Sequence, residues 1–170
     1  MNRPHYILLP VNPVFIVGSL LGTFLLNFLP WGSSFGVPDF VALTLVFWSI
    51  HQPRRVGIGV AFVMGLLMDV HTATLLGENA LAYTLLSYYA ITIHRRVLWF
   101  SPMHQTMYVF PLFLFSQIIR ALIQFIVIGK FPGWLFFTES VVTAALWPLA
   151  NWLLLAPQRR AIDRDETRPI

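Results

Sequence analysis

The chain of 170 residues contains no cysteine, which excludes disulfides, iron–sulfur clusters and thiol catalysis. Charge is also scarce, because charged residues make up 11% of the chain where soluble domains carry about a quarter. Hydrophobic residues make up 57% of the chain, and the mean hydropathy is +0.71. A soluble domain of this size could not bury so much apolar surface. The composition therefore predicts a protein whose solvent is lipid.

The few basic residues do not form one patch. The net charge is +4, which would be compatible with nucleic-acid binding, but the arginines lie in short clusters between apolar runs. That distribution is typical of membrane proteins, in which basic residues mark the cytoplasmic loops. We therefore expect membrane lipid, and no nucleic acid, as a partner.

Six apolar segments span residues 13–29, 37–50, 56–70, 80–93, 106–128 and 134–155. A helix needs about 20 residues to cross the hydrocarbon core, and backbone at that depth must pair its own amides. The pattern predicts an all-α membrane protein. It consists of a bundle of about six transmembrane helices over residues 1–156 and a polar cytoplasmic tail over 157–170. The segments 56–70 and 80–93 are short, so a re-entrant hairpin remains an alternative to two full crossings.

The basic residues also predict the orientation. With the N-terminus in the cytoplasm, nine of them lie in the inner regions: Arg3, Arg54, Arg55, Arg95, Arg96, Arg159, Arg160, Arg164 and Arg168. Lys130 lies in an outer loop, and Arg120 lies within the fifth segment. This positive-inside bias predicts a multi-pass protein with both termini in the cytoplasm.

Small residues form a row in the third segment, at Gly57, Ala61 and Gly65, and the row ends at Asp69. Residues four apart share one helix face, and small side chains allow two helix backbones to approach closely in lipid. The row predicts internal packing, with docking of a partner's transmembrane helix as the alternative. The first segment carries a shorter row at Gly18 and Gly22.

Charges inside or beside apolar segments are costly, so they are paired or functional. Arg120 in the fifth segment and Glu139 in the sixth lie on neighbouring segments joined by a short turn, which predicts an ion pair between them. Asp39 opens the second segment on the outer side, Asp69 ends the third segment there, and Glu78 lies in the next outer loop. Two readings remain open for these charges: structural pairing, and a ligand pocket or partner-recognition surface.

No catalytic, cofactor or metal site is predicted. The sequence has no G-x-S-x-G, Walker A or H-E-x-x-H motif. No histidine has a second histidine four residues away, as a helical metal site would require. We therefore expect a protein that is not an enzyme.

Several short motifs occur together in one order. Pro38-Asp39 opens the second segment, Gly65-Leu66-Leu67-Met68-Asp69 closes the third, and Leu76-Gly77-Glu78-Asn79-Ala80-Leu81 leads into the fourth. In this order, and at this length, they resemble the MreD family of rod shape-determining proteins, especially its proteobacterial form. The matching positions Pro38, Asp39, Gly65, Asp69, Gly77 and Asn79 are then candidates for structural or interaction sites.

The resemblance implies a role rather than a reaction. MreD-like proteins act beside MreC, the MreB filament, the glycosyltransferase RodA and its class B penicillin-binding transpeptidase, which together build side-wall peptidoglycan at the bacterial inner membrane. The family is also similar to the six-helix S-components of energy-coupling vitamin transporters. The leading hypothesis is therefore a membrane scaffold that binds MreC directly and MreB indirectly. The alternatives are a solute-binding subunit of a vitamin-type transporter and, more remotely, a membrane enzyme of lipid-linked precursor metabolism.

Overall fold

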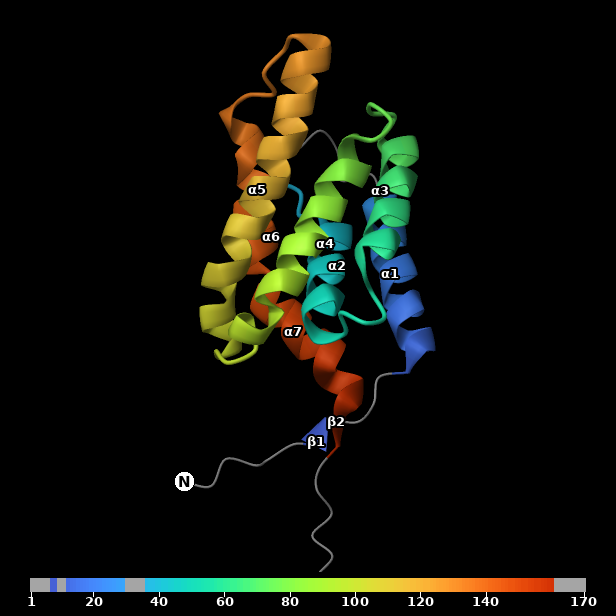
Figure 1. The fold of residues 1–170 in the computed structure, drawn as a ribbon, viewed down its shortest axis with the longest axis vertical. Helices are drawn as coiled ribbons and strands as arrows, with labels where there is room; N and C mark the ends of the chain where they lie inside the picture. The colour runs from blue at the N-terminus through green and yellow to red at the C-terminus, as the bar shows by residue number, and fades with distance from the viewer. Residues whose placement is uncertain (1–6, 9–11, 30–35, 161–170) are drawn as a thin grey trace, which may run out of the picture.

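The computed structural model describes residues 7–8, 12–29 and 36–160, which form a helical bundle (Figure 1). In chain order its elements are β1 (Ile7–Leu8), α1 (Pro13–Asn27), α2 (Phe40–His51), α3 (Ile58–Thr72), α4 (Glu78–Val97), α5 (Pro102–Ile128), the 3-10 helix η1 (Trp134–Phe137), α6 (Thr138–Ala145), α7 (Trp147–Leu155), the 3-10 helix η2 (Ala156–Gln158) and β2 (Arg159–Arg160). The two strands pair antiparallel, with Ile7 opposite Arg160. Apart from this short strand pair, the described residues confirm the predicted all-α class.

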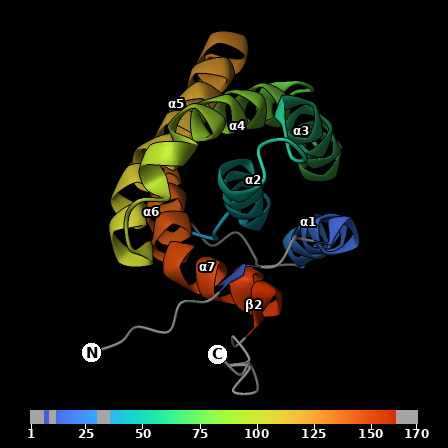
Figure 2. The ribbon, with the colours of Figure 1, turned by 60° about the horizontal axis from the view of Figure 1, so that its bottom comes forward.

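The helix α2 is the centre of the bundle, and Figure 2 shows the other helices arranged around it. All ten residues from Val41 to Ile50 are buried, including Phe47 and Trp48. The indole Nε1 of Trp48 donates a hydrogen bond of 2.8 Å to Ser19 Oγ of α1. A helix that is apolar on every side is typical of one enclosed by its neighbours.

The surface around this core is apolar on several helices. Exposed hydrophobic side chains include Leu25 on α1, Val70 on α3, Met107 on α5 and Leu149 on α7, each more than half exposed. Exposed apolar area spread over so many helices would favour aggregation in water. The outer faces of the bundle therefore match a lipid environment.

Two stretches of helix, Pro102–Ile128 and Trp134–Gln158, are long and apolar enough to cross a membrane. The apolar helices α1, α2 and α3 have 15, 12 and 15 residues, fewer than the roughly 20 that span a hydrocarbon core. Six complete crossings therefore stay a prediction.

The fourth helix extends beyond the apolar segment that marks it in the sequence. α4 begins at Glu78 and has 20 residues, whereas the apolar segment covers residues 80–93. The polar residues at both of its ends continue the helix. The carboxylate of Glu78 interacts favourably with the positive N-terminal end of the helix dipole, and Arg95 and Arg96 interact favourably with its negative C-terminal end.

The predicted sixth segment is not one continuous helix. α6 ends at Ala145 and α7 begins at Trp147, with Pro148 in its first turn. Proline lacks the backbone N–H and its ring clashes with the carbonyl four residues before it, so a helix breaks or kinks there.

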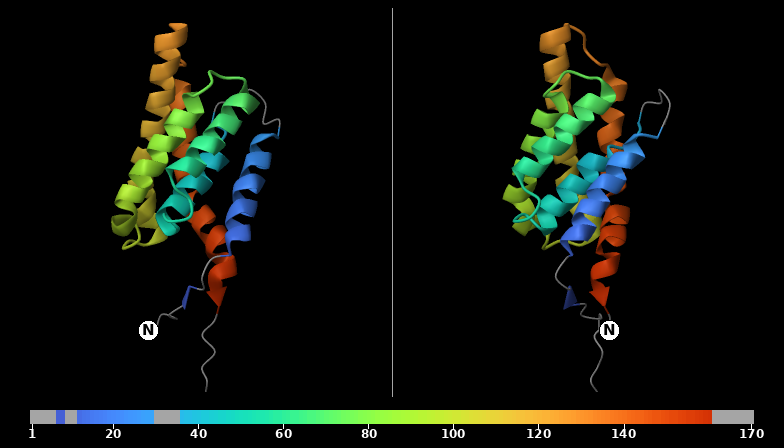
Figure 3. Two further views of the ribbon diagram at one scale, coloured as in Figure 1. Left: turned by 45° about the vertical axis from the view of Figure 1, so that its right-hand side comes forward. Right: turned by 90° about the vertical axis from the view of Figure 1, so that its right-hand side faces the viewer.

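The bundle has two distinct ends. At the end that we call terminal lie the β1–β2 pair, the α2–α3 turn and the α4–α5 turn; at the opposite, distal end lie the α3–α4 turn and the α5–η1 turn (Figure 1). Figure 3 shows α5 extending past the other helices at the distal end. The turns at the terminal end carry Arg54, Arg55 and, at the end of α4, Arg95 and Arg96, whereas the α5–η1 turn carries Lys130. The predicted separation of basic residues thus corresponds to two physical ends of the bundle. The predicted tail over 157–170 lies outside the described residues from residue 161 onward.

Candidate functional site

Arg120 of α5 lies in the interior toward the distal end, within a cluster of polar side chains. Its Nη2 donates a hydrogen bond of 2.8 Å to Glu139 Oε1 of α6, and its Nη1 lies 3.4 Å from Asn79 Oδ1 of α4. Asp39 Oδ2 is 4.0 Å from the same guanidinium. The guanidinium carbon also lies 5.4 Å from the centre of the Phe136 ring. The predicted Arg120–Glu139 pair is present, and it forms part of a larger network.

Asp39 links three helices to this network. Its carboxylate caps α2 by accepting a hydrogen bond of 2.9 Å from the Ala42 amide. It accepts a second bond, of 2.6 Å, from the Tyr83 hydroxyl of α4. Its own amide donates to the Thr143 hydroxyl of α6 at 3.0 Å. Asp39 therefore fixes the start of α2 against α4 and α6, and Pro38 directly precedes it.

Asp69 joins the end of α3 to the start of α4. Its carboxylate accepts hydrogen bonds from the amides of Gly77 at 2.8 Å, Asn79 at 2.7 Å and Ala80 at 3.3 Å. The first amides of a helix have no partner within the helix and carry partial positive charge, so a carboxylate stabilises them. Asp69 thus acts as a distant cap for α4, and the positive φ angles of Ala73 and Gly77 close the turn between the helices.

Glu78 is not a loop residue, contrary to the sequence-based reading. It is the first residue of α4, is 3% exposed, and accepts a hydrogen bond of 2.6 Å from Gln124 Nε2 of α5. Gln117, one turn before Arg120, donates to the Phe136 carbonyl at 3.0 Å. The polar face of α5 is therefore matched by partners from α4, η1 and α6.

Little space remains inside the network. A void of about 10 Å³ is lined by Asp39, Ala42, Phe113, Ser116, Gln117, Arg120, Glu139, Ser140 and Thr143. Such a volume is of the order of one water molecule, whereas small-molecule sites occupy about 300–1,000 Å³. Two buried polar atoms of its lining, Gln117 Oε1 and Arg120 Nε, have no hydrogen-bond partner among the residues that the structure describes. The arrangement can hold charges together, but it has no room for a vitamin-sized solute.

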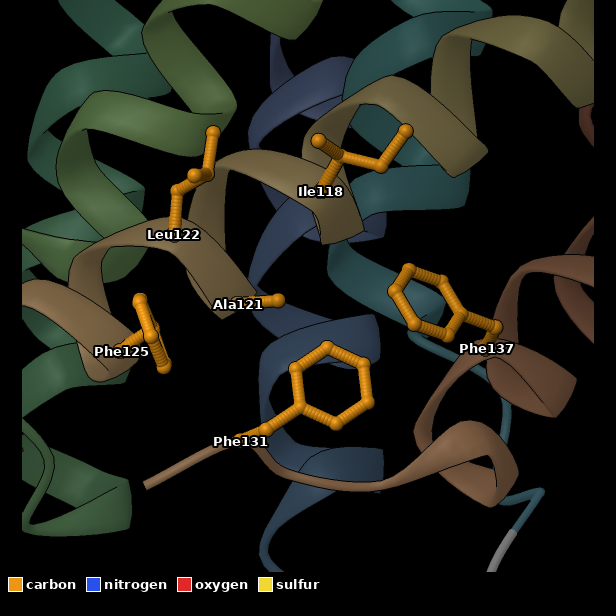
Figure 4. A pocket seen from close by; sticks show the side chains of 6 residues that line it. All are labelled: Ile118, Ala121, Leu122, Phe125, Phe131 and Phe137. Atoms are coloured by element: carbon orange, nitrogen blue, oxygen red, sulfur yellow. The ribbon is translucent and has the colours of Figure 1, made fainter. Parts of the chain in front are cut away.

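A larger hollow lies on the surface beside α5. Figure 4 shows this groove of about 290 Å³, which is lined by Ile118, Ala121, Leu122, Phe125, Phe131 and Phe137. Every lining residue is apolar, so the groove offers no side-chain hydrogen bond or charge to orient a polar solute. It is typical of a surface in contact with lipid chains.

The small residues of the third segment have different surroundings. Gly65 lies directly against the backbone of α4, and Ala61 is fully buried one turn earlier. Gly57 precedes the first residue of α3, and a β-carbon placed on it would meet only a backbone oxygen, at 4.0 Å. Gly18 and Gly22 of α1 face open space within the described chain. A close helix contact is therefore formed by Gly65 and not by the whole row.

A second polar cluster, which the sequence reasoning missed, lies toward the terminal end. Gln105 Oε1 of α5 accepts hydrogen bonds from Trp147 Nε1 at 3.1 Å and from Asn151 Nδ2 at 2.7 Å. Gln105 Nε2 donates to the Phe100 carbonyl at 3.0 Å. The signal in the sequence was Asn151 within the sixth apolar segment and Gln105 directly before the fifth, since buried amide groups pair with one another.

No described group of three histidine, aspartate or glutamate side chains has a geometry that could hold a metal ion. Most polar groups of both clusters contact one another, or the ends of helices, within the described chain; Gln117 Oε1, Arg120 Nε and Asn151 Oδ1 are the exceptions there. Their arrangement resembles the polar contacts that join helices in membrane bundles.

Comparison with known proteins identifies the family. The family model for rod shape-determining protein MreD matches residues 10–156. A relative from Haemophilus influenzae, the rod shape-determining protein MreD, is 27% identical over 146 residues, which cover 82% of this chain and 86% of the relative. No solved structure is significantly similar to the chain, so the likeness to S-components stays a prediction. The matched residues include α1 to α7 and both polar clusters, and the chain therefore belongs to the MreD family of rod shape-determining membrane proteins.

Proposed function

We propose that this protein is a non-enzymatic scaffold of the cell-wall elongation complex, which binds MreC and supports side-wall peptidoglycan synthesis by RodA and its class B transpeptidase. The observation that carries the proposal is the family match over residues 10–156, which encloses every α-helix of the described chain. MreB is connected to the scaffold indirectly, from the cytoplasmic side.

The proposed placement is a multi-pass bundle in the bacterial inner membrane with both termini in the cytoplasm. The arginine-bearing turns and the β1–β2 pair share the terminal end, and cytoplasmic loops are enriched in such residues. The short helix α2 needs little contact with lipid, because ten of its residues are buried by other helices. The distal end, with Lys130, would then face the outside.

The polar network supports a structural role for the interior charges. Arg120 is paired with Glu139, and Asp39 and Asp69 are occupied by hydrogen bonds from other helices. Neither the family match nor the Haemophilus influenzae relative supports a vitamin-transporter subunit. The small volume of the void is a further argument against solute binding.

Crosslinking to MreC tests this proposal. Because the chain has no cysteine, single cysteines can be placed on exposed positions of each outer helix, for example Val17 on α1, Val70 on α3 and Trp152 on α7. Crosslinking to co-expressed MreC should occur on one contiguous face, and the parent chain should give no crosslink. Absence of MreC from the purified complex, together with rod-shaped cells after deletion of the gene, would refute the proposal.

A further inference from the structure

The α4–α5 turn carries a surface depression that the polar networks described above do not use. The depression has a volume of about 390 Å³ and is lined by Arg95, Arg96, Trp99 and Phe100. Both arginines are exposed, and neither forms an ion pair with any described carboxylate. Two guanidinium groups and two aromatic rings therefore share one open hollow.

The spacing of these residues explains why they meet. Arg95 and Arg96 lie in the last turn of α4, which ends at Val97. Trp99 lies in the turn directly after the helix and lines the same hollow as both arginines. Trp99 is 90% exposed, whereas Val97 is fully buried and holds the turn against the bundle. An exposed tryptophan beside arginines is typical of the boundary between lipid headgroups and chains.

The turn is held in place by α5 and α7. The Phe100 ring stacks on Tyr108 of α5, with ring centres 4.9 Å apart and planes inclined by 23°. The Phe100 carbonyl accepts the hydrogen bond from Gln105, which is in turn bonded to Trp147 and Asn151 of α7. The second polar cluster thus fixes the position of the aromatic part of the hollow.

We propose that this hollow is a binding site for the headgroup of an anionic phospholipid. Guanidinium groups bind phosphate oxygens through paired hydrogen bonds, and the rings of Trp99 and Phe100 would contact the glycerol and upper chain carbons. The hollow lies at the terminal end, which the arginine distribution assigns to the cytoplasmic leaflet, where anionic lipids interact with basic residues near the membrane. Arginines in the last turn of a helix also stabilise it by interacting with the negative end of its dipole. That role would not explain the hollow or the exposed aromatic rings beside the arginines.

Lipid retention by the purified full-length protein tests the site. The protein in detergent would be mixed with phosphatidylglycerol or with phosphatidylcholine of the same chains, and the bound lipids counted by native mass spectrometry. We expect phosphatidylglycerol to be preferred, and each of Arg95→Gln and Arg96→Gln to reduce its retention about fivefold. Trp99→Ala should reduce the retention of phosphatidylglycerol as well, and the double lysine variant Arg95→Lys with Arg96→Lys should retain an intermediate amount.

The matched control is the double variant Arg54→Gln with Lys130→Gln, which removes two exposed charges elsewhere. It should retain phosphatidylglycerol like the parent chain. An equal loss in this control would show that the lipid is attracted by overall charge, and it would overturn the proposed site.

Displacement of the lipid by millimolar inorganic phosphate would overturn the proposal of a lipid site and would indicate a site for a soluble anion instead. Equal retention of phosphatidylglycerol and phosphatidylcholine would also overturn the proposal, and an acidic protein segment would then be the better candidate for the ligand of the two arginines. Because the four residues lie on the surface, thermal unfolding of the variants should match that of the parent chain.

Discussion

Gly65 of α3 packs against Ala80 of α4 so closely that no side chain fits between the two backbones. A β-carbon built on Gly65 would lie 2.6 Å from the Ala80 nitrogen and 2.7 Å from the Asn79 carbonyl oxygen. Real β-carbons do not approach other atoms to that distance. The contact involves backbone atoms, which cannot rotate away as the end of a side chain can.

The substitution Gly65→Ala should therefore destabilise the bundle. Even one methyl group requires α3 and α4 to separate, and overpacking typically costs about 1–3 kcal/mol. Thermal unfolding in detergent should show the loss. Gly22→Ala is the matched control, because its β-carbon meets nothing within 4 Å. Equal stability of the two variants would contradict the close packing of α3 on α4.

Loss of the Arg120 charge should cost more than loss of the Glu139 charge. Arg120→Gln leaves Glu139 and Asp39 together without a cation, whereas Glu139→Gln leaves Arg120 beside Asp39 at 4.0 Å. Breaking a buried pair by removal of one partner typically costs about 3–5 kcal/mol. Chemical or thermal unfolding should rank the two variants in that order, and Lys130→Gln should have little effect.

Exchange of the two charges should recover little stability. In the double variant Arg120→Glu with Glu139→Arg, the new glutamate would lie next to Asp39, and like charges at that distance repel. A double variant as stable as the parent chain would show that Asp39 is not part of the network. Stable single variants that still bind MreC, yet give round cells, would instead favour a functional rather than structural role for the pair.

Asp69→Asn should weaken the junction of α3 with α4. The two carboxylate oxygens of Asp69 accept three hydrogen bonds from backbone amides. In asparagine an NH2 group replaces one of these oxygens, and this donor would face a backbone N–H, which is also a donor. Hydrogen bonds to charged groups contribute about 1.5–3 kcal/mol, so a loss of that size is expected. Hydrogen exchange at the amides of the first turn of α4 should accelerate before that of the α5 core. Unchanged exchange there would contradict the role of Asp69 as a cap.

The proposed topology predicts which cysteines react from outside. An impermeant thiol reagent should label Thr74→Cys and Lys130→Cys in intact cells, since both exposed positions lie at the distal end. Arg54→Cys, exposed at the terminal end, should react only after the cells are permeabilised. Labelling of position 130 without position 74 would mean that α3 and α4 form a re-entrant hairpin.

The Arg120–Glu139 pair could be predicted from the sequence because α5 and α6 are neighbours joined by a short turn, which brings their polar faces together. The position of Asp39 beside Arg120 could not be predicted, because α2 and α5 are distant in sequence and only the tertiary packing brings them together. Glu78 was misread as a loop residue because a charged residue at a helix start looks like a boundary when its partner, Gln124, is unknown. These contacts depend on the arrangement of the helices, which local patterns do not specify.

The break in the sixth segment had a local signal in Pro148. A run of apolar residues long enough to cross a membrane outweighed that signal, because proline is tolerated within membrane helices. The cluster around Gln105 was missed for a different reason. A single amide in an apolar helix does not identify its partner, and here the partners come from α7.

The central position of α2 also constrains how the protein is made. α2 is synthesised second among the α-helices, but the helices that enclose it include α4, α6 and α7, which follow much later in the chain. During synthesis the apolar surface of α2 must therefore contact lipid or the insertion machinery until those helices have been made and pack against it. A chain interrupted before α7 leaves a 12-residue helix that is too short to span the bilayer and has lost part of its cover.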